Sequence, residues 1–217
     1  MHRTPLLDAI AACERHWRDV AYADRDAAED AAIATRLKSF ITTTTGCFDR
    51  EQLDGHITAS ALVVTPDLAS VLLTLHAKLG IWLQLGGHSD SHPRPADVAM
   101  REVEEESGLT RVSFLPYEEL LPTWATAPVE TPLPFDLDWH VIPARKQEPA
   151  HVHYDVRFLI VADPTEPPRI SAESRDLRWF DLAGARAVTS ERSMRRQFDK
   201  IEWLAARRES LAGAQGG

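Results

Sequence analysis

The residues most able to do chemistry form an acidic run between Arg101 and Leu109. On a helix, side chains three or four positions apart share a face, which would bring Glu102, Glu105 and Glu106 together with their Cβ atoms about 5–6 Å apart. Like charges at that separation repel one another. A solvated face tolerates such a charge run, whereas a divalent cation would remove the repulsion, since hard oxygen ligands suit Mg²⁺ or Mn²⁺. The run therefore indicates either an acidic surface or a metal site.

The residues around the acidic run favour the metal site, because together they resemble the Nudix box, G-x5-E-x7-R-E-U-x-E-E-x-G-U, in which U is a bulky aliphatic residue. The matching residues are Gly87, Arg101, Glu102, Val103, Glu105, Glu106, Gly108 and Leu109. The fourteen-residue spacing from Gly87 to Arg101 also agrees with the box. A β-rich run leads into Gly86-Gly87 and a helical run follows, which is the structural context that such a motif needs.

Resemblance to the Nudix family implies an α/β/α sandwich around a mixed sheet. It implies a hydrolase that cleaves a phosphoanhydride bond in a nucleoside diphosphate linked to another moiety, with Mg²⁺ or Mn²⁺ held by Glu102, Glu105 and Glu106. It also implies that Arg101 orients one of these glutamates, so that Arg101, Glu105 and Glu106 are the catalytic residues. A cation held there would neutralise phosphate oxygens and position a water molecule in line with phosphorus.

One position departs from the box. Pro93 stands where the family has its isolated glutamate, six residues after the opening glycine. In the family that glutamate supports the loop and the arginine, a task for which Asp90 or Asp97 is a nearby candidate. The loss leaves open a non-catalytic alternative, in which a Nudix-like domain binds a nucleotide as a sensor. The intact metal-ligand positions favour a working enzyme over the sensor.

A further alternative comes from Ser91-His92-Pro93, which looks like the Ser-His-Pro loop of isopentenyl diphosphate isomerases. Those enzymes share the Nudix fold, and the loop would explain the proline. That family needs a cysteine just before the loop, however, where this chain has Ser89 and Asp90. Without a thiol the isomerase reaction lacks its acid, so hydrolysis is the main hypothesis.

Histidines on two expected strands form a second candidate site. Under strand periodicity His151, His153 and Asp155 point to one face, and the strand that holds His140 could lie beside them. Such a cluster can bind phosphate, orient a base or take a second metal, or its members can simply face solvent. The substrate-binding residues expected from the sequence are Gly86, Gly87, His88, His140, His151, His153 and Asp155, and the candidate general base is Glu173.

The hydrophobic pattern shows which elements must position these residues. It predicts two helices over residues 4 to 45, strands over 57–65, 71–76 and 81–85, a helix over 96–106 ended by Gly108, strands over 139–142, 152–162 and 177–180, and a last helix over 192–211. Seven of the fourteen prolines fall between residues 116 and 149, which indicates a long irregular connection that could shape a pocket mouth.

This order of elements predicts an α/β fold with three parts. They are a helical N-terminal extension over residues 1–50, a Nudix hydrolase domain over 51–211 and a disordered tail over 212–217.

The composition excludes several classes of protein. The chain has 217 residues, with 24 Lys and Arg against 33 Asp and Glu and a net charge of −9, whereas nucleic-acid binders usually show a basic face. No stretch reaches the ~18 apolar residues of a membrane span, and the N-terminus lacks a secretory pattern. The two cysteines, Cys13 and Cys47, cannot form a disulfide framework. We therefore expect a cytoplasmic protein that acts on a small phosphorylated substrate, with no nucleic-acid polymer or membrane as partner and with a homodimer left open.

Overall fold

The computed structural model describes residues 3–18, 20, 27–120, 132–145 and 149–215. Its helices are α1 (Thr4–Arg18), α2 (Ala27–Thr43), α3 (Pro95–Ser107), α4 (Leu182–Val188) and α5 (Arg192–Gln215), and a 3₁₀ turn, η1, spans Tyr117–Leu120. Its strands are β1 (Gly55–Val64), β2 (Ser70–His76), β3 (Trp82–Leu83), β4 (Leu85–His88), β5 (Val112–Phe114), β6 (Asp136–Ile142), β7 (His151–Ala162) and β8 (Ser174–Asp181). The predicted helices and strands are confirmed, except that one predicted strand is divided into β3 and β4. The short elements β5, η1 and α4 were not predicted.

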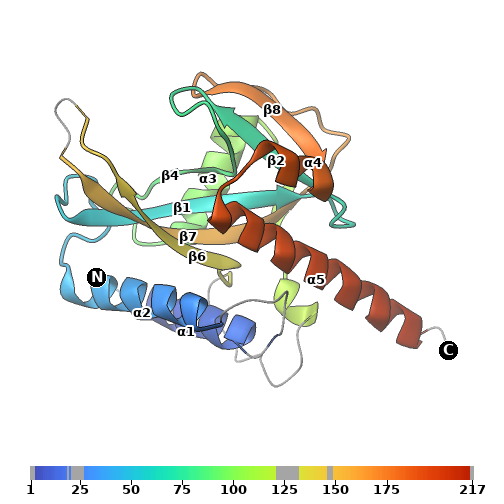
Figure 1. Cartoon of the computed structure of the whole chain (residues 1–217), viewed down its shortest axis with the longest axis horizontal. Coiled ribbons are helices and arrows are strands. Elements are labelled where there is room, and N and C mark those ends of the chain that lie inside the picture. Colours follow the sequence, from blue (N-terminus) through green and yellow to red (C-terminus); the bar gives the residue numbers. More distant parts are fainter. Residues whose placement is uncertain (1–2, 19, 21–26, 121–131, 146–148, 216–217) are drawn as a thin grey trace.

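The described strands form one mixed sheet that curls strongly (Figure 1). The pair β1 and β7 is parallel over the whole length of β1, and the other pairs are antiparallel. On the side away from β7, β1 pairs with β4 near its start and with β2 near its end. On the side away from β1, β7 pairs with β6 near its start and with β5 near its end. This topology places β4, β1, β7 and β6 side by side, so that side chains from four strands can meet on one face.

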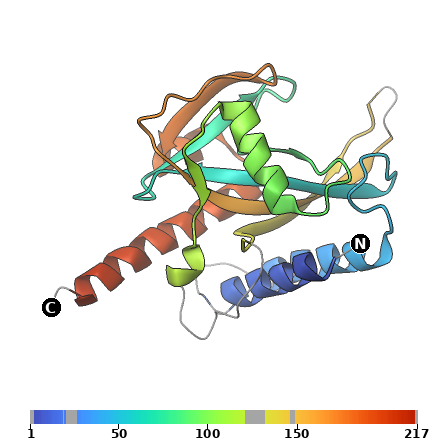
Figure 2. The ribbon, with the colours of Figure 1, turned by 180° about the vertical axis from the view of Figure 1, so that it is seen from behind.

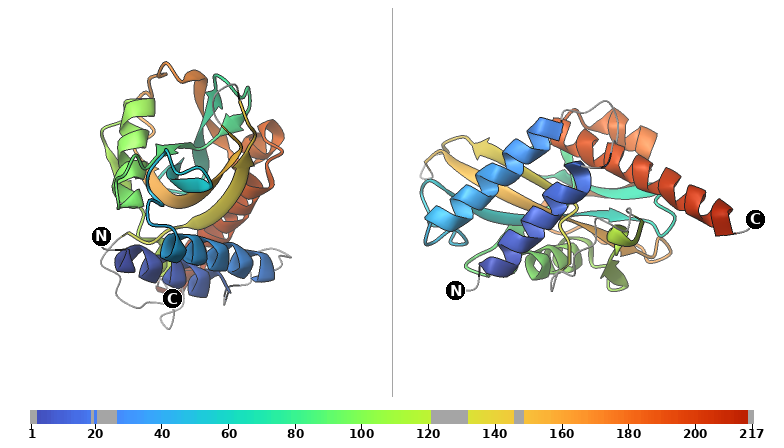
Figure 3. Two further views of the ribbon diagram at one scale, coloured as in Figure 1. Left: turned by 90° about the vertical axis from the view of Figure 1, so that its left-hand side faces the viewer. Right: turned by 90° about the horizontal axis from the view of Figure 1, so that it is seen from below.

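Helices cover both faces of the sheet. Helix α3 packs on β1, β4 and β7 through Val98, Ala99 and Val103, and α5 lies on the opposite side of the sheet (Figures 2 and 3). Every residue of β1 is buried, as expected for a central strand covered on both faces. On α5 the buried face includes Phe198 and Ile201, as the helical spacing predicts. The fold is therefore the α/β/α sandwich around a mixed sheet that the sequence indicates.

The two N-terminal helices pack against each other (Figure 3, right), and α2 packs along β6. Phe40 of α2 stacks on Tyr154 of β7 with ring centroids 4.0 Å apart, and the guanidinium of Arg36 lies 3.6 Å from the ring centroid of Trp139. Apolar residues of α1 and α2 belong to the same core as the sheet. The helical extension expected over residues 1–50 is therefore packed as a further layer of the domain.

The end of the chain differs from the prediction. Helix α5 continues to Gln215, so residues 212–215 are helical rather than disordered, because Ala212 and Ala214 have the highest helix propensity and continue the pattern. Residues 216–217, the rest of the predicted tail, lie outside the described residues, as do 121–131 and 146–148 of the proline-rich stretch. Among the described helices, none combines the length and the apolar character of a transmembrane segment.

Candidate active site

The segment that resembles the Nudix box is built by β4 and α3, and its glycines lie where these elements meet. A Cβ added to Gly87 would lie 2.6 Å from Cδ of Glu102, and one added to Gly86 would lie 2.3 Å from Cβ of Ser60 on β1. Any larger residue at these positions would push the strand away from the helix or from β1. Helix α3 starts at Pro95 and stops at Gly108, whose φ of 65° lies in the left-handed region. The two glycines of β4 therefore allow the backbone to approach the glutamates of α3.

A carboxylate cluster forms beside Gly87 and consists of Glu102, Glu105, Glu106 and Glu173. Glu106 is only 9% exposed, and its pKa rises to about 8, first because of burial and then because of the charges of Glu102 and Glu173. Burial also raises the pKa of Glu102, with an opposing effect from Arg101. The side chain of Glu105 is exposed. The cluster thus holds more negative charge than its surroundings compensate.

Arg101 is the cation that contacts this cluster directly. Its Nη2 donates to Oε1 of Glu102 over 2.9 Å and to the carbonyl oxygen of His88 over 3.5 Å, and its Nε lies 3.9 Å from Oε1 of Glu105. The arginine therefore ties α3 to the end of β4 and fixes the direction of the Glu102 carboxylate. One guanidinium among four carboxylates leaves the cluster short of positive charge.

Glu173 reaches the cluster from the loop before β8. Its carbonyl oxygen accepts a hydrogen bond of 2.9 Å from the backbone N–H of Ala77, which holds the loop against the end of β2. Its charge raises the pKa of both Glu102 and Glu106. The side chain is exposed. The sequence placed Glu173 as a candidate base on weak grounds, and the structure brings it beside the box glutamates.

The donor set of the carboxylate cluster fits a divalent cation with oxygen ligands. Among the described residues, the three box glutamates do not bring one ligand atom each within 4.8 Å of one another. Mg²⁺ usually keeps several waters and is bound through one or two carboxylates plus substrate phosphates, so a loose set of this kind suits it. The raised pKa of the Glu106 carboxyl also shows that positive charge is missing at this cluster.

The loop without the family's glutamate contains two replacement candidates, and the structure separates them. Asp97 is engaged by the guanidinium of Arg94 and lies 3.8 Å from Nε2 of His92. Asp90 instead acts on Arg101, whose pKa its charge helps to raise. Of the two carboxylates, Asp90 is therefore the one whose charge supports the arginine of the cluster.

Five rings, here called the histidine cluster, gather on the other face of the same strands: His56, His88, His140, His151 and His153. The pairing of strands explains this, since His153 lies opposite His56 on β1 and opposite His140 on β6. The centroid of the His153 ring is 4.8 Å from that of His56, 4.9 Å from that of His88 and 5.4 Å from that of His140. The predicted meeting of His140, His151 and His153 is thus confirmed. His56 was missed, although the alternating pattern His56-x-Thr58-x-Ser60 was a signal that could have found it.

Three members of the histidine cluster are uncharged at neutral pH. Burial is the main cause, and it lowers the pKa of His56 to about 4, that of His88 to about 4 and that of His153 to about 2. Neighbouring rings add to the effect, as does Arg50, whose Nη2 lies 3.2 Å from Nδ1 of His88. These imidazoles are therefore suited to offer lone pairs or N–H groups rather than positive charge.

Asp155, a predicted substrate-binding residue, lies on the same strand face as the histidines but is engaged by other side chains. It is 5% exposed, and its carboxylate accepts hydrogen bonds from Thr58 at 3.0 Å, Ser60 at 2.8 Å and Nε of Arg157 at 2.8 Å. With its oxygens occupied and shielded, Asp155 orients side chains between β1 and β7. The alternation of side chains along a strand correctly predicts that Asp155 shares a face with His151 and His153. The sequence did not reveal its hydrogen-bond partners.

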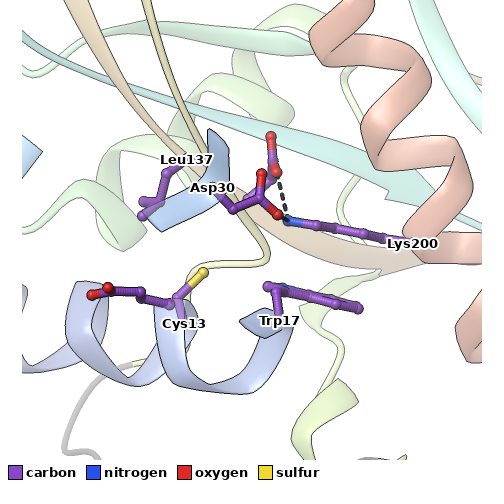
Figure 4. Close-up of a pocket in the computed structure, with 7 residues that line it drawn as sticks. Cys13, Trp17, Asp30, Leu137 and Lys200 are labelled. Carbon is purple, nitrogen blue, oxygen red and sulfur yellow. Dashed lines mark hydrogen bonds and ion pairs between the residues drawn. The ribbon is translucent and has the colours of Figure 1, made fainter. Parts of the chain in front are cut away.

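Asp155 belongs to a buried charge network made of Asp136, Asp138, Asp155, Arg157, Arg196 and Lys200. Arg196 of α5 donates to both oxygens of Asp136 at 2.8 Å, and Nζ of Lys200 lies 2.6 Å from Oδ1 of the same residue. Figure 4 shows the Lys200 ammonium beside Trp17 of α1, 4.7 Å from its ring centroid. The network therefore joins α5 and the N-terminal helices to β6 and β7.

Comparisons with known proteins agree with this architecture. A family model described as NUDIX domain matches residues 55–201. A Caenorhabditis elegans Ap4A hydrolase in a binary complex is similar with 15% identity and a TM-score of 0.51, covering 69% of this chain and 97% of that one. A NUDIX family hydrolase from Clostridium perfringens is similar with 22% identity and a TM-score of 0.46, again covering 69% and 97%. No curated protein matches the chain. At such identities the likeness to solved structures concerns the fold.

Proposed function

We propose that the chain cleaves a nucleoside diphosphate linked to another moiety with the help of Mg²⁺. The chain belongs to the Nudix family, through a domain that spans residues 55–201, and is thus a pyrophosphohydrolase that acts on acid anhydrides. The carboxylate cluster is the observation that carries this proposal. Its most buried member, Glu106, has a pKa of about 8 in the absence of a cation. A buried carboxyl of this kind is suited to bind a cation that the substrate also needs.

Glu102, Glu105 and Glu106 are the residues that would hold the cation. When bound, the cation neutralises phosphate oxygens and supports attack by water at phosphorus. Binding requires Glu106 to lose its proton, so affinity for the cation rises with pH up to about 8. Mn²⁺ has similar ligand preferences and is the expected substitute.

Arg101 acts on the glutamates rather than on the substrate. Its hydrogen bond of 2.9 Å to Glu102 fixes the direction of that carboxylate, and its contact with the carbonyl oxygen of His88 holds α3 near β4. Outer partners of this kind orient metal ligands and affect affinity for the metal. Arg101 is therefore a positioning residue in this proposal.

Glu173 is the residue that would accept a proton from the attacking water. It is exposed and directly precedes β8, and its charge acts on both Glu102 and Glu106. A general base must reach the proton that it removes within hydrogen-bond distance, directly or through one water. Gly86 and Gly87, without Cβ atoms, let β1 and the Glu102 carboxylate come close to the backbone of β4.

The proposal is tested with a substrate panel. Purified protein with Mg²⁺ or Mn²⁺ should release phosphate, pyrophosphate or nucleoside monophosphate from at least one of the nucleoside triphosphates, dinucleoside polyphosphates, nucleotide sugars or ADP-ribose. The double variant Glu105→Gln, Glu106→Gln should lose this activity. Glu104→Gln is the matched control, because Glu104 is on the same helix and exposed but is not part of the cluster.

Absence of turnover above the double variant would contradict the proposal. Tight nucleotide binding in a calorimeter without turnover would then favour the sensor alternative. The isomerase alternative has less support, because both cysteines of the chain, Cys13 and Cys47, are buried. A cytoplasmic location and a homodimer stay predictions from the sequence.

A further inference from the structure

The last two residues of β4 face opposite sides of the sheet. Consecutive residues of a strand alternate between faces, and Gly87 faces Glu102 of α3. The ring of His88 accordingly lies among other histidines, with its centroid 5.0 Å from that of His56 and 4.9 Å from that of His153. The carbonyl oxygen of His88 accepts from Arg101. The histidine cluster is therefore a separate site on the back of the strand that carries the box glycines.

The ring nitrogens of His56 indicate that this site binds a ligand. The residue is 2% exposed, and neither of its ring nitrogens makes a hydrogen bond, although the backbone of Gln52 lies close enough to favour a protonated ring slightly. Burying an imidazole without partners is costly, since buried polar groups are nearly always satisfied. The ring faces three other histidines at centroid distances of 4.8 to 5.1 Å. A ligand that accepts the lone pairs of these nitrogens would remove the cost.

We propose that His56, His88 and His153 bind a transition-metal ion that prefers imidazole nitrogen, with Zn²⁺ as the expected ion. One ligand atom from each of the three already lies within 4.8 Å of the others, and among the described residues this is the set that meets that condition. Two nitrogens bound at 2.0–2.1 Å in tetrahedral geometry lie about 3.4 Å apart. The ligand nitrogens would therefore have to approach one another by up to about 1.4 Å, through changes of side-chain torsion.

The backbone around this site is suited to a metal. The three ligands come from β1, β4 and β7, which are adjacent strands joined by backbone hydrogen bonds. Sites on strands are held more precisely than sites on loops. Binding would link the parallel pair of β1 and β7 to the strand that carries the box glycines.

Neighbouring residues complete or oppose the site. Nε2 of His151 lies 3.2 Å from Nε2 of His153, so His151 is placed either to fill the fourth position or to hold the His153 ring. His140 lies farther out, with Nδ1 3.7 Å from a carboxylate oxygen of Asp138. The charged groups at His88 are Arg50 and Asp90. Arg50 contacts Nδ1 of His88. The ion must therefore displace Arg50 from Nδ1 or bind to Nε2 of His88 instead.

The ligand chemistry distinguishes this site from the carboxylate cluster. Imidazole nitrogen suits Zn²⁺, Cu²⁺ and Ni²⁺, whereas Mg²⁺ and Mn²⁺ take oxygen ligands. The inference does not rest on the proposed hydrolysis, because its argument uses residues on the other face of the sheet. A protein with both sites would bind two different kinds of metal ion on the two sides of β4.

Titration with Zn²⁺ in the presence of saturating Mg²⁺ tests the proposal. The full chain, freed of metal by a chelator, should bind one Zn²⁺ per chain, as measured by calorimetry and by metal analysis after dialysis. His56→Phe and His153→Gln should each weaken binding more than about 100-fold, since the loss of an outer partner alone costs about 10- to 100-fold. His92→Gln is the matched control, because His92 contacts Arg94 and Asp97 rather than the cluster, and should bind as the unaltered protein does.

Two further measurements identify the site and its ion. Glu105→Gln, Glu106→Gln should bind Zn²⁺ unchanged, and a loss of binding in this variant would mean that Zn²⁺ occupies the carboxylate cluster instead. Co²⁺ should give the visible absorption of a four-coordinate site with nitrogen ligands, and Ni²⁺ and Cu²⁺ should compete with Zn²⁺.

The proposal is overturned if the unaltered protein does not take up Zn²⁺ in the presence of Mg²⁺, or if His56→Phe binds as tightly as it does. Circular dichroism checks that each variant is folded. Should His56→Phe not fold, His88→Gln and His153→Gln decide the matter, since both residues are partly exposed and their replacement leaves no apolar cavity.

Discussion

The buried charge network and the carboxylate cluster both place acidic groups against the same sheet, on opposite faces, and their electrostatics are opposite. In the network, burial opposes ionisation of Asp136, but the charges of Arg196 and Lys200 hold its pKa well below the usual range. In the cluster, burial and like charges raise the pKa of Glu106 to about 8. The network contains its own cations within 2.6 to 2.8 Å of Asp136, whereas in the cluster Arg101 contacts Glu102 and Glu105.

This difference separates structural charge from functional charge. A buried acid that meets its counter-charge within the chain joins elements of the fold, here β6 with α5. A buried acid without one has a perturbed pKa and needs a ligand from outside, which is typical of functional sites. The histidine cluster is a third case, because the buried ring of His56 lacks hydrogen-bond partners rather than a counter-charge.

The largest expected effect comes from breaking the network. Arg196→Ala removes its two hydrogen bonds to Asp136, which keeps Lys200 and Arg157 as partners but stays buried. Removing one partner of a buried pair typically costs about 3–5 kcal/mol. Denaturant unfolding should show a loss of this size. Arg195→Ala is the control, because Arg195 is exposed on the same helix and should change stability by less than about 0.5 kcal/mol. A loss below about 1 kcal/mol for Arg196→Ala would mean that the network does not stabilise the fold.

A smaller effect, on activity, is expected at the edge of the cluster. Glu173→Gln should lower kcat about 100- to 10,000-fold, since a positioned general base contributes in this range, while the stability of the protein stays nearly unchanged because the side chain is exposed. The change in kcat is measured with whichever substrate the panel identifies. An unchanged kcat would exclude Glu173 as the base.

The cluster should also make the metal-free protein less stable at high pH. The pKa of Glu106 is about 8 in the folded protein against an ordinary value of 4.5. Its ionisation therefore costs no stability below about pH 4.5, and the cost grows as pH rises and is complete above about pH 8. Glu106→Gln removes this cost, so the variant should be about 4–5 kcal/mol more stable than the unaltered protein at pH 9 in a chelator, and about equal to it at pH 4.5. Denaturant unfolding at the two pH values measures the difference, and equal pH dependence in both proteins would contradict the raised pKa.

Local patterns in the sequence were sufficient for the box and the main elements. The spacing of Glu102, Glu105 and Glu106 predicts their common helix face, and Gly108 predicts where α3 ends. The alternation of His151 and His153 predicts their common strand face. Each of these predictions depends on residues within one or two turns or along a single strand, where periodicity is informative.

Contacts between distant segments could not be predicted in this way. His56 meets His153 only because β1 and β7 are paired in parallel with one particular register. Asp136 contacts Arg196 across 60 residues of sequence, and no pattern in either segment predicts this pair. The short elements β5 and α4 have too few residues for a period to show, and they form because the surrounding sheet and α5 provide their partners.

The central claim is that the carboxylate cluster is completed by a divalent cation, and thermal unfolding with and without Mg²⁺ tests it most directly. At pH 8, Mg²⁺ at about 100 times its dissociation constant should stabilise the unaltered protein by about 2.7 kcal/mol and raise its Tm accordingly. Glu106→Gln should show a much smaller rise in Tm, and Glu104→Gln the full one. A Tm that Mg²⁺ leaves unchanged in the unaltered protein, or raises equally in Glu106→Gln, would contradict the account.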